Sequence, residues 1–216
     1  MSTVALAFDP VRHEYRLPGG ELVPSVTQIL RDTGVSVDFQ ALSEMSADIG
    51  AAITLKRDIG TALHADAHAY DDDDLDWSTV NPLVEPYLRA WATFRANFPH
   101  LRPETRERQV FHGLYRYGGT LDGILVNPDT GHRVLVDLKT GDPEAAGARY
   151  QLAGYQLAYQ FEHPETVIHE RWSVQLTPDR QVPYRVHPYH DARDAQVWRS
   201  IVTTYYAQAS RRRTAS

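Results

Sequence analysis

A chain of 216 residues, of which 42% are hydrophobic and 23% charged, is long enough to bury its own core, and we expect a single domain over residues 1–216. The absence of cysteine excludes disulfides, thiolate zinc sites, iron–sulfur clusters and a cysteine nucleophile. The formal net charge of −6 argues against binding of nucleic acid through bulk positive charge, so a polyanion would have to meet a local basic patch or a bound cation.

The sequence also bears on the compartment. It has no run of about 20 apolar residues that could span a bilayer. Residues Met1 to Pro10 lack the basic region and the long apolar run of a secretory signal. We therefore expect a cytoplasmic protein with no membrane partner.

The chain begins with the pattern of a small hairpin. Phe8 to Arg16 and Glu21 to Val23 flank the turn Pro18–Gly20 and read as short strands. Ser25 or Thr27 can then cap a short helix.

Helical patterns follow up to residue 98. We expect a helical region from about Phe39 to Tyr70, broken near Gly50 and Gly60, and then a solvated acidic loop over Asp71 to Asp76. Apolar residues at helical spacing then predict a helix that buries one face, formed by Leu83, Tyr87, Trp91, Phe94 and Phe98.

The rest of the chain alternates strands and helices. We predict strands at Arg106–Phe111, Tyr115–Val126 and His132–Thr140, a helix at Ala146–Phe161, strands at Val167–Leu176 and Pro183–His187, and a helix at Asp191–Ser210. This order predicts an α/β fold whose central mixed sheet contains an antiparallel meander and is flanked by helices. The hairpin and first helices occupy residues 1–100, the core 101–165, and the last strands and helix 166–216.

The hairpin between the second and third of these strands places two carboxylates together. The turn residues 128–131 would pair Asn127 with His132, and the same register sets Asp122 opposite Asp137. A register shifted by one residue would make the two aspartates diagonal neighbours instead.

Two opposed carboxylates among apolar residues repel each other and cost free energy when buried. A divalent cation between Asp122 and Asp137 removes both penalties, and carboxylates are ligands that Mg²⁺ or Mn²⁺ prefers. The alternative is a salt-bridged group on an exposed sheet face.

Lys139 lies on the same strand face as Asp137, because side chains alternate along a strand. Of the 22 basic residues, only Lys56 and Lys139 are lysines. A chain that normally uses arginine for positive charge has kept a lysine here, which favours a metal-centred site over a plain salt bridge.

Two further pairs have helical spacing. Gln151 and Tyr155 share a helix face, as do His64 and His68. The first pair is also consistent with ordinary surface polarity. The His pair lacks the glutamate that follows the first histidine in zinc proteases, so we reject that class and keep a single His as a candidate metal ligand.

In chain order, these residues resemble the motifs of a known superfamily. The motifs are Gly60-Thr61-x-x-His64, Glu107-x-x-Val110, Gly119-x-x-Asp122, Asp137-Leu138-Lys139-Thr140 and Gln151-x-x-x-Tyr155. Together they resemble the PD-(D/E)XK nucleases, and more narrowly the RecB-like exonuclease branch. The segments His13-x-Tyr15 and Pro24 to Leu30 are similar to small phage and prophage members. The resemblance covers about residues 8 to 160.

The resemblance implies a restriction-endonuclease-like core and a role for each motif. His64, Asp122 and Asp137 would bind the metal, with the Leu138 carbonyl as a fourth ligand. Lys139 would position or activate the attacking water, and Glu107 would support the metal site from the neighbouring strand. The implied DNA contacts are Gly60 and Thr61, at a helix start that approaches phosphate, and Gln151 and Tyr155.

These expectations describe an Mg²⁺- or Mn²⁺-dependent deoxyribonuclease, with exonuclease action in phage-type recombination, repair or DNA processing. The expected partner is DNA, and a recombination or single-strand-binding protein is a candidate second partner. The alternative is a non-catalytic DNA-binding or assembly protein that keeps the nuclease fold. A glycosidase is disfavoured, because carboxylates opposed on one hairpin leave little room for a sugar.

Overall fold

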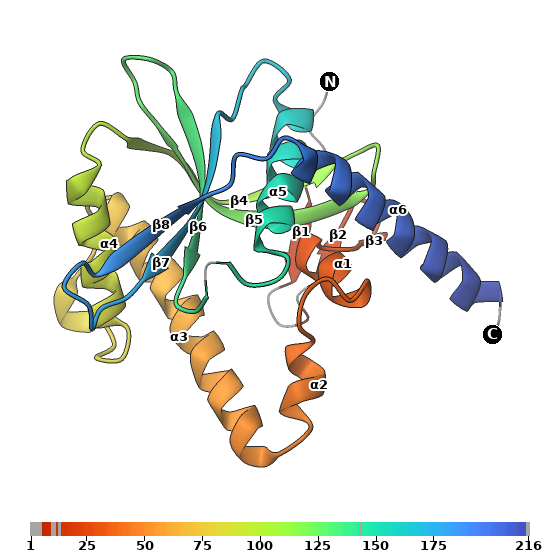
Figure 1. Ribbon diagram of the computed structural model, residues 1–216, viewed down its shortest axis with the longest axis horizontal. Helices are drawn as coiled ribbons and strands as arrows, with labels where there is room; N and C mark the ends of the chain where they lie inside the picture. The colour runs from red at the N-terminus through yellow and green to blue at the C-terminus, as the bar shows by residue number, and fades with distance from the viewer. Residues whose placement is uncertain (1–5, 10–11, 13, 143, 215–216) are drawn as a thin grey trace.

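A five-stranded mixed sheet organises the computed structural model, which describes residues 6–9, 12, 14–142 and 144–214 (Figure 1). Its strands follow the order β4 (Arg102–His112), β5 (Tyr117–Val126), β6 (Arg133–Lys139), β7 (Glu170–Leu176) and β8 (Tyr184–Pro188). Only β6 and β7 pair in parallel among these five strands. The predicted α/β class, the mixed sheet and its antiparallel meander β4–β5–β6 are confirmed.

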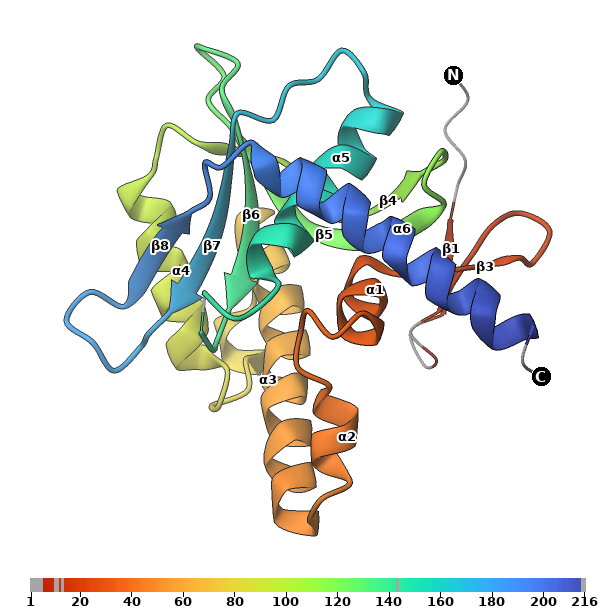
Figure 2. The same cartoon turned by 45° about the vertical axis from the view of Figure 1, so that its right-hand side comes forward.

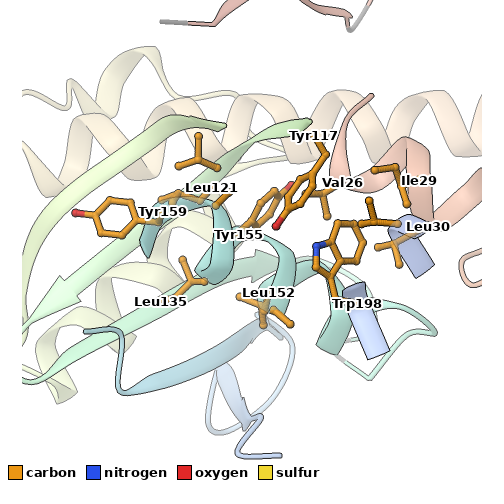
Figure 3. Close-up of a cluster of buried hydrophobic side chains, with 14 of the residues drawn as sticks. Val26, Ile29, Leu30, Tyr117, Leu121, Leu135, Leu152, Tyr155, Tyr159 and Trp198 are labelled. Carbon is orange, nitrogen blue, oxygen red and sulfur yellow. The ribbon is translucent and has the colours of Figure 1, made fainter. Parts of the chain in front are cut away.

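One face of the sheet is covered by α5 (Ala148–Glu162), which crosses from β6 to β7, together with α1 (Val26–Asp32) and α6 (Arg193–Thr214). Figure 3 shows the apolar cluster beneath them, in which Leu152 and Trp198 are fully buried. A Cβ atom on Gly154 would lie 2.8 Å from the Trp198 ring, so this glycine allows α5 and α6 to approach closely.

The opposite face is covered by α3 (Ala47–Asp71) and α4 (Glu85–Asn97). A second apolar cluster lies there, with Leu63, Leu88 and Phe94 packed against Val136 and Val174 of the sheet. Burial on both faces explains the almost continuous apolar run of β6. Within the described ranges, no helix is both long and apolar enough to cross a lipid bilayer.

A small three-stranded sheet precedes these elements, formed by β1 (Ala7–Asp9), β2 (Glu14–Arg16) and β3 (Leu22–Val23). The predicted strand Phe8–Arg16 is therefore wrong in part, because it folds back on itself as two antiparallel strands. His13 lies outside the described residues. Ser25 caps α1 by accepting the Gln28 N–H, as expected for one of the two candidate caps.

The predicted breaks at Gly50 and Gly60 are wrong. α3 runs without interruption through both glycines, and the break falls before Ser46, between α3 and the short α2 (Phe39–Ser43). Ser46 caps α3 by accepting the Ile49 N–H at 3.2 Å. A glycine inside a helix costs only about 1 kcal/mol relative to alanine, which a long helix packed on the sheet can tolerate.

The acidic stretch is not wholly a solvated loop. Asp71 is the last residue of α3 and forms a buried ion pair with Arg95 of α4 at 2.9 Å, while Asp72 pairs with Arg106 of β4 at 2.7 Å. Asp76 caps the short helix η1 (Trp77–Thr79). Asp71 and Asp72 therefore link the end of α3 to α4 and β4.

Two predicted boundaries also move. Leu83 is not part of the buried stripe, because it is 56% exposed and α4 begins at Glu85, with Pro86 in its first turn. β4 begins at Arg102 rather than Arg106 and contains a register shift between Pro103 and Thr105. A bulge of this kind re-aims the residues that follow it.

Candidate metal centre

The β5–β6 hairpin has the predicted register. Val126 pairs with Arg133 and Gly123 with Val136, so Asp122 and Asp137 occupy the next opposed positions. The ladder ends there, because Asp122 Oδ2 accepts the Leu138 N–H at 2.7 Å. At this position the Asp122 side chain, rather than the β5 backbone, accepts the hydrogen bond from β6.

Glu107 extends this row onto a third strand. Arg106 pairs with Gly123 and Arg108 with Leu121, which sets Glu107 beside Asp122. Glu107 itself has a left-handed backbone, with φ of 41°, and this conformation costs on the order of 1–3 kcal/mol for a residue other than glycine. A carboxylate thus stands at a strained position in the middle of a long strand.

The side-chain alternation of β5 is interrupted at the same place. Leu121 and Ile124, an odd number of residues apart, both pack in the cluster beneath α5. Strict alternation would place them on opposite faces. The irregularity releases Glu107 and Asp122 from the ladder and lets both meet α3.

His64 of α3 completes this group. Its Nδ1 atom lies 3.1 Å from Glu107 Oε1 and 3.7 Å from Asp122 Oδ1. One ligand atom from each of the three residues falls within 4.8 Å of the others. Glu107, expected to support the site, is thus closer to His64 Nδ1 than the predicted ligand Asp122.

The electrostatics of this group favour a positive charge. The Asp122 carboxylate raises the pKa of His64 to about 9, while burial raises the pKa of Asp122 to about 7. The imidazole is therefore protonated at neutral pH when only protein groups are present. The proton on His64 supplies the positive charge that a metal ion would otherwise supply between Glu107 and Asp122.

A second group lies on β6 and α5. Lys139 Nζ lies 2.9 Å from Asp137 Oδ2 and donates to Oδ1 at 3.1 Å. Gln151 donates to Asp137 Oδ1 at 3.2 Å, and its own Oε1 accepts from Lys139 at 3.3 Å. The prediction that Lys139 shares the face of Asp137 is confirmed.

Lys139 remains a cation in this environment. Burial acts to lower its pKa, but the carboxylates of Asp137 and Asp122 outweigh burial and leave the pKa raised. An ammonium with a raised pKa is a poor base at neutral pH. It can instead donate hydrogen bonds and hold a negatively charged group in place.

Tyr155 closes the site beneath Gln151. Gln151 Nε2 lies 3.4 Å from its hydroxyl, and burial raises the pKa of that hydroxyl well above its ordinary value. Gly119 leaves room for the ring, since a Cβ atom there would lie 2.6 Å from Tyr155 Cε1. Tyr155 is only 5% exposed and contacts the site itself, so its expected contact with DNA and that of Gln151 stay predictions.

Gly60 and Thr61 do not lie at a helix start, and that part of the prediction is wrong. Both sit inside α3, one turn before His64, where their backbone N–H groups belong to the helix. Thr61 Oγ1 donates to the Arg57 carbonyl at 3.1 Å. His68, four residues after His64, lies 3.6 Å from Asp72 instead of joining the site.

The Leu138 backbone faces Asp122. Because the N–H and C=O groups of one strand residue point to the same neighbouring strand, the Leu138 carbonyl is directed to the β5 side together with its N–H. That direction is the one its expected role as a fourth ligand requires.

Sequence reasoning missed Ser173. The parallel register of β6 and β7 pairs it with Asp137, and the residue is fully buried. Its Oγ has no hydrogen-bond partner among the described residues. A lone hydroxyl between Trp172 and Val174 was the available signal, but only the parallel pairing reveals its neighbour.

The residues present fit a divalent cation. Glu107, Asp122 and His64 bring two carboxylates and one imidazole within 4.8 Å of one another, and these are hard oxygen and nitrogen donors that Mg²⁺ and Mn²⁺ take. Asp137 lies opposite Asp122 on β6, outside this group of three. Asp137 Oδ2 is buried, and no group in the described part of the chain donates a hydrogen bond to it, although Lys139 Nζ is nearby. At 2.9 Å the Lys139 ammonium already balances the charge of this oxygen, so a metal ion bound by Asp137 would share the carboxylate with Lys139.

Comparisons with known proteins assign no family to the chain, so a functional proposal rests on the geometry of the site. No protein-family model matches the chain, and no curated protein matches its sequence.

Proposed function

We propose that this protein is a divalent-metal-dependent deoxyribonuclease of the PD-(D/E)XK type, with a restriction-endonuclease-like core and exonuclease action. The observation that carries the proposal is the row of Glu107, Asp122 and Asp137 on three neighbouring strands, flanked by His64 and Lys139. Asp137 is buried, Asp122 is partly buried and Glu107 is exposed. Carboxylates this close repel one another, so the row lowers stability unless positive charge lies among them.

The donors that would hold Mg²⁺ or Mn²⁺ are His64, Glu107, Asp122 and Asp137, with the Leu138 carbonyl. A cation held there would supply Lewis-acid polarisation of a phosphate oxygen and would lower the pKa of an attacking water. The bound cation would also offset negative charge locally, which would help an overall acidic chain accept a phosphodiester.

The chain's own residues then have separate tasks. The Lys139 ammonium would hold the attacking water or a phosphate oxygen beside Asp137, because it stays protonated and has one donor beyond those that bind Asp137 Oδ1 and Gln151 Oε1. Gln151 would fix the orientation of both, since it contacts Asp137 Oδ1 and Lys139 at once. Tyr155 would support Gln151 from below.

The test is incubation of the purified protein with linear and circular DNA, each single- and double-stranded, in Mg²⁺, Mn²⁺ or EDTA. We expect degradation of linear DNA in either metal, none in EDTA, and survival of covalently closed circles. The matched control is Asp137→Asn, which removes one charge with little change in shape.

Full cleavage in EDTA would overturn the metal requirement. Rapid nicking of circles would keep the metal centre but replace exonuclease by endonuclease action. Metal-dependent DNA binding without cleavage of any substrate would favour the non-catalytic alternative.

A further inference from the structure

The first half of α3 forms an arm with α2. In Figures 1 and 2 this helical hairpin projects away from the sheet, while the second half of α3 packs on the sheet and carries His64. α2 lies on one side of the arm, where a Cβ atom on Gly50 would meet the Ser43 carbonyl at 3.0 Å.

The other side of the arm carries an exposed apolar stripe. Met45 is 71% exposed, Ile49 42% and Leu55 51%, and Ala52 between them is also exposed. Gly50 and Ala52 lie about 160° apart around a helix, so the stripe faces away from α2. Large apolar side chains gathered on a projecting element mark an interaction surface rather than a random exposure.

The stripe is complementary to itself. If two copies of α3 cross antiparallel at Ala52, Ile49 of each faces Leu55 of the other. The same two-fold places Asp48 opposite Lys56. Both charged residues are exposed, and within one chain they lie about 12 Å apart along the helix, too far to pair.

Charge and side-chain size both favour a second copy of this chain as the partner of the stripe. Two-fold interfaces need one surface that matches itself, which this stripe provides in both apolar and charged positions. Ala52 at the crossing is small enough for helix axes to approach within about 8–10 Å. DNA is disfavoured here, because residues 38–58 carry more acidic than basic side chains, namely Asp38, Glu44, Asp48 and Asp58 against Lys56 and Arg57.

We infer that the arm is a homodimerisation surface, at which α3 packs antiparallel against α3 of a second copy on a two-fold axis at Ala52. The inference is independent of the proposed nuclease chemistry, because every readout below is a mass or a covalent link. It also gives Lys56, the second of the two lysines, a place opposite a carboxylate.

A charge-exchange cycle tests the register. Sedimentation measures self-association of the wild type, Asp48→Lys, Lys56→Asp and the double exchange. We expect a wild-type dimer, at least ~5-fold weaker association in each single variant because two like-charge pairs form, and recovery to within ~3-fold in the double exchange. Circular dichroism should be unchanged throughout, because both positions are exposed. A wild type that stays monomeric to about 100 µM overturns the inference, as does a double exchange that recovers nothing.

Crosslinking tests the axis directly. The chain has no cysteine, so Ala52→Cys introduces one reporter without background. A two-fold at Ala52 brings the two Cα atoms within the range of roughly 4.4–6.8 Å that a disulfide spans, so mild oxidation should give a covalent dimer. The matched control is Leu114→Cys, at a position 74% exposed in the β4–β5 turn, which should stay monomeric. Equal crosslinking of the two variants would show random collision and overturn the proposed axis.

Discussion

The two halves of the candidate metal centre are built in different ways. On β6 and α5, Asp137, Lys139 and Gln151 sit on a regular strand and a regular helix and satisfy one another by hydrogen bonds. On β4 and β5, Glu107 has a left-handed backbone and Asp122 has left the ladder, and both turn to His64. The regular half supplies a fixed positive charge, while the strained half gathers negative charge.

This difference indicates which half of the site lowers the stability of the folded protein. The β6–α5 half is stable as it stands, because the Lys139 charge balances Asp137. The β4–β5 half concentrates two carboxylates around one imidazole at the expense of backbone strain, as is common at functional sites. Variants that remove a carboxylate from the strained half should therefore gain stability, whereas variants that remove the Asp137 carboxylate from the regular half should not.

The largest expected effect comes from removing a carboxylate of the central pair. Asp122→Asn or Asp137→Asn should reduce turnover by ~10³-fold, the upper end of the loss on removing a group that stabilises transition-state charge. Both should also weaken Mn²⁺ binding in calorimetry. Without metal, Asp122→Asn should be at least as stable as the parent, because burial already opposes the charge of Asp122.

Asp137→Asn sharpens the comparison, since it leaves Lys139 without its ion-pair partner. We expect it to be the less stable of the two variants in thermal unfolding without metal. The reverse order would show that strain and repulsion are not concentrated on the β4–β5 side.

Lys139→Arg and Lys139→Ala should each reduce single-turnover cleavage by at least ~10²-fold, because a guanidinium is planar and broad where an ammonium is compact. Metal-dependent DNA binding should be largely kept, as the ligand carboxylates remain. The measurement pairs cleavage in Mg²⁺ with a binding titration in Ca²⁺. An arginine variant within a few-fold of wild type would leave Lys139 as a counter-charge to Asp137 alone.

The His64 proton predicts how metal binding depends on pH. Because the pKa of His64 is raised to about 9 and that of Asp122 to about 7, Mn²⁺ must displace the His64 proton, and between pH 7 and 9 its affinity should rise by about tenfold per pH unit. Calorimetry in buffers of different ionisation enthalpy measures the proton released. In His64→Gln the dependence should be much shallower, and an equally steep one would assign the proton to another group.

The same shift affects the metal-free protein. The folded-state pKa of His64 lies above the unfolded value of 6.5, so its contribution to stability is fully present below pH 6.5 and is lost as pH rises through about 9. Thermal unfolding of the parent and of His64→Gln should therefore converge at high pH.

The smallest expected effect concerns strain. Glu107→Gly should raise the free energy of unfolding by about 1 kcal/mol, because glycine adopts a positive φ without penalty, and should weaken Mn²⁺ binding. The matched control is Arg116→Gly, which has φ of 50° in the β4–β5 turn away from the site. It should gain similar stability with no change in metal binding, and a loss of affinity there would point to a general disturbance of the sheet.

Local rules of sequence predicted some contacts of the site, whereas others depend on backbone strain or on distant strand pairing. The register that opposes Asp122 and Asp137 and the shared face of Asp137 and Lys139 follow from turn chemistry and alternation, which are local rules. The left-handed Glu107 could not be predicted, because nothing in its neighbours demands a positive φ. Ser173 required the parallel β6–β7 pairing, which joins residues far apart in the chain.

The errors in the fold have a similar origin. Gly50 and Gly60 lower helix propensity, yet α3 continues, because its second half packs on the sheet and Gly50 packs against Ser43 of α2. Asp71 looked solvated because acidic runs usually are, while its partner Arg95 lies on another helix. In each case a distant contact outweighed a local preference.

The single parallel pair of the sheet also has a consequence for the order of folding. The turns within β4–β5–β6 are short, so this meander can form from contacts close in sequence, whereas β7 pairs with β6 only after the chain has closed a loop across α5. We expect conservative truncations in the β5–β6 hairpin, such as Ile124→Val, to slow refolding, and Val174→Ala in β7 mainly to accelerate unfolding. The carboxylates of the centre would then be brought together before Ser173 arrives, so the repulsion among them opposes an early step of folding rather than the last.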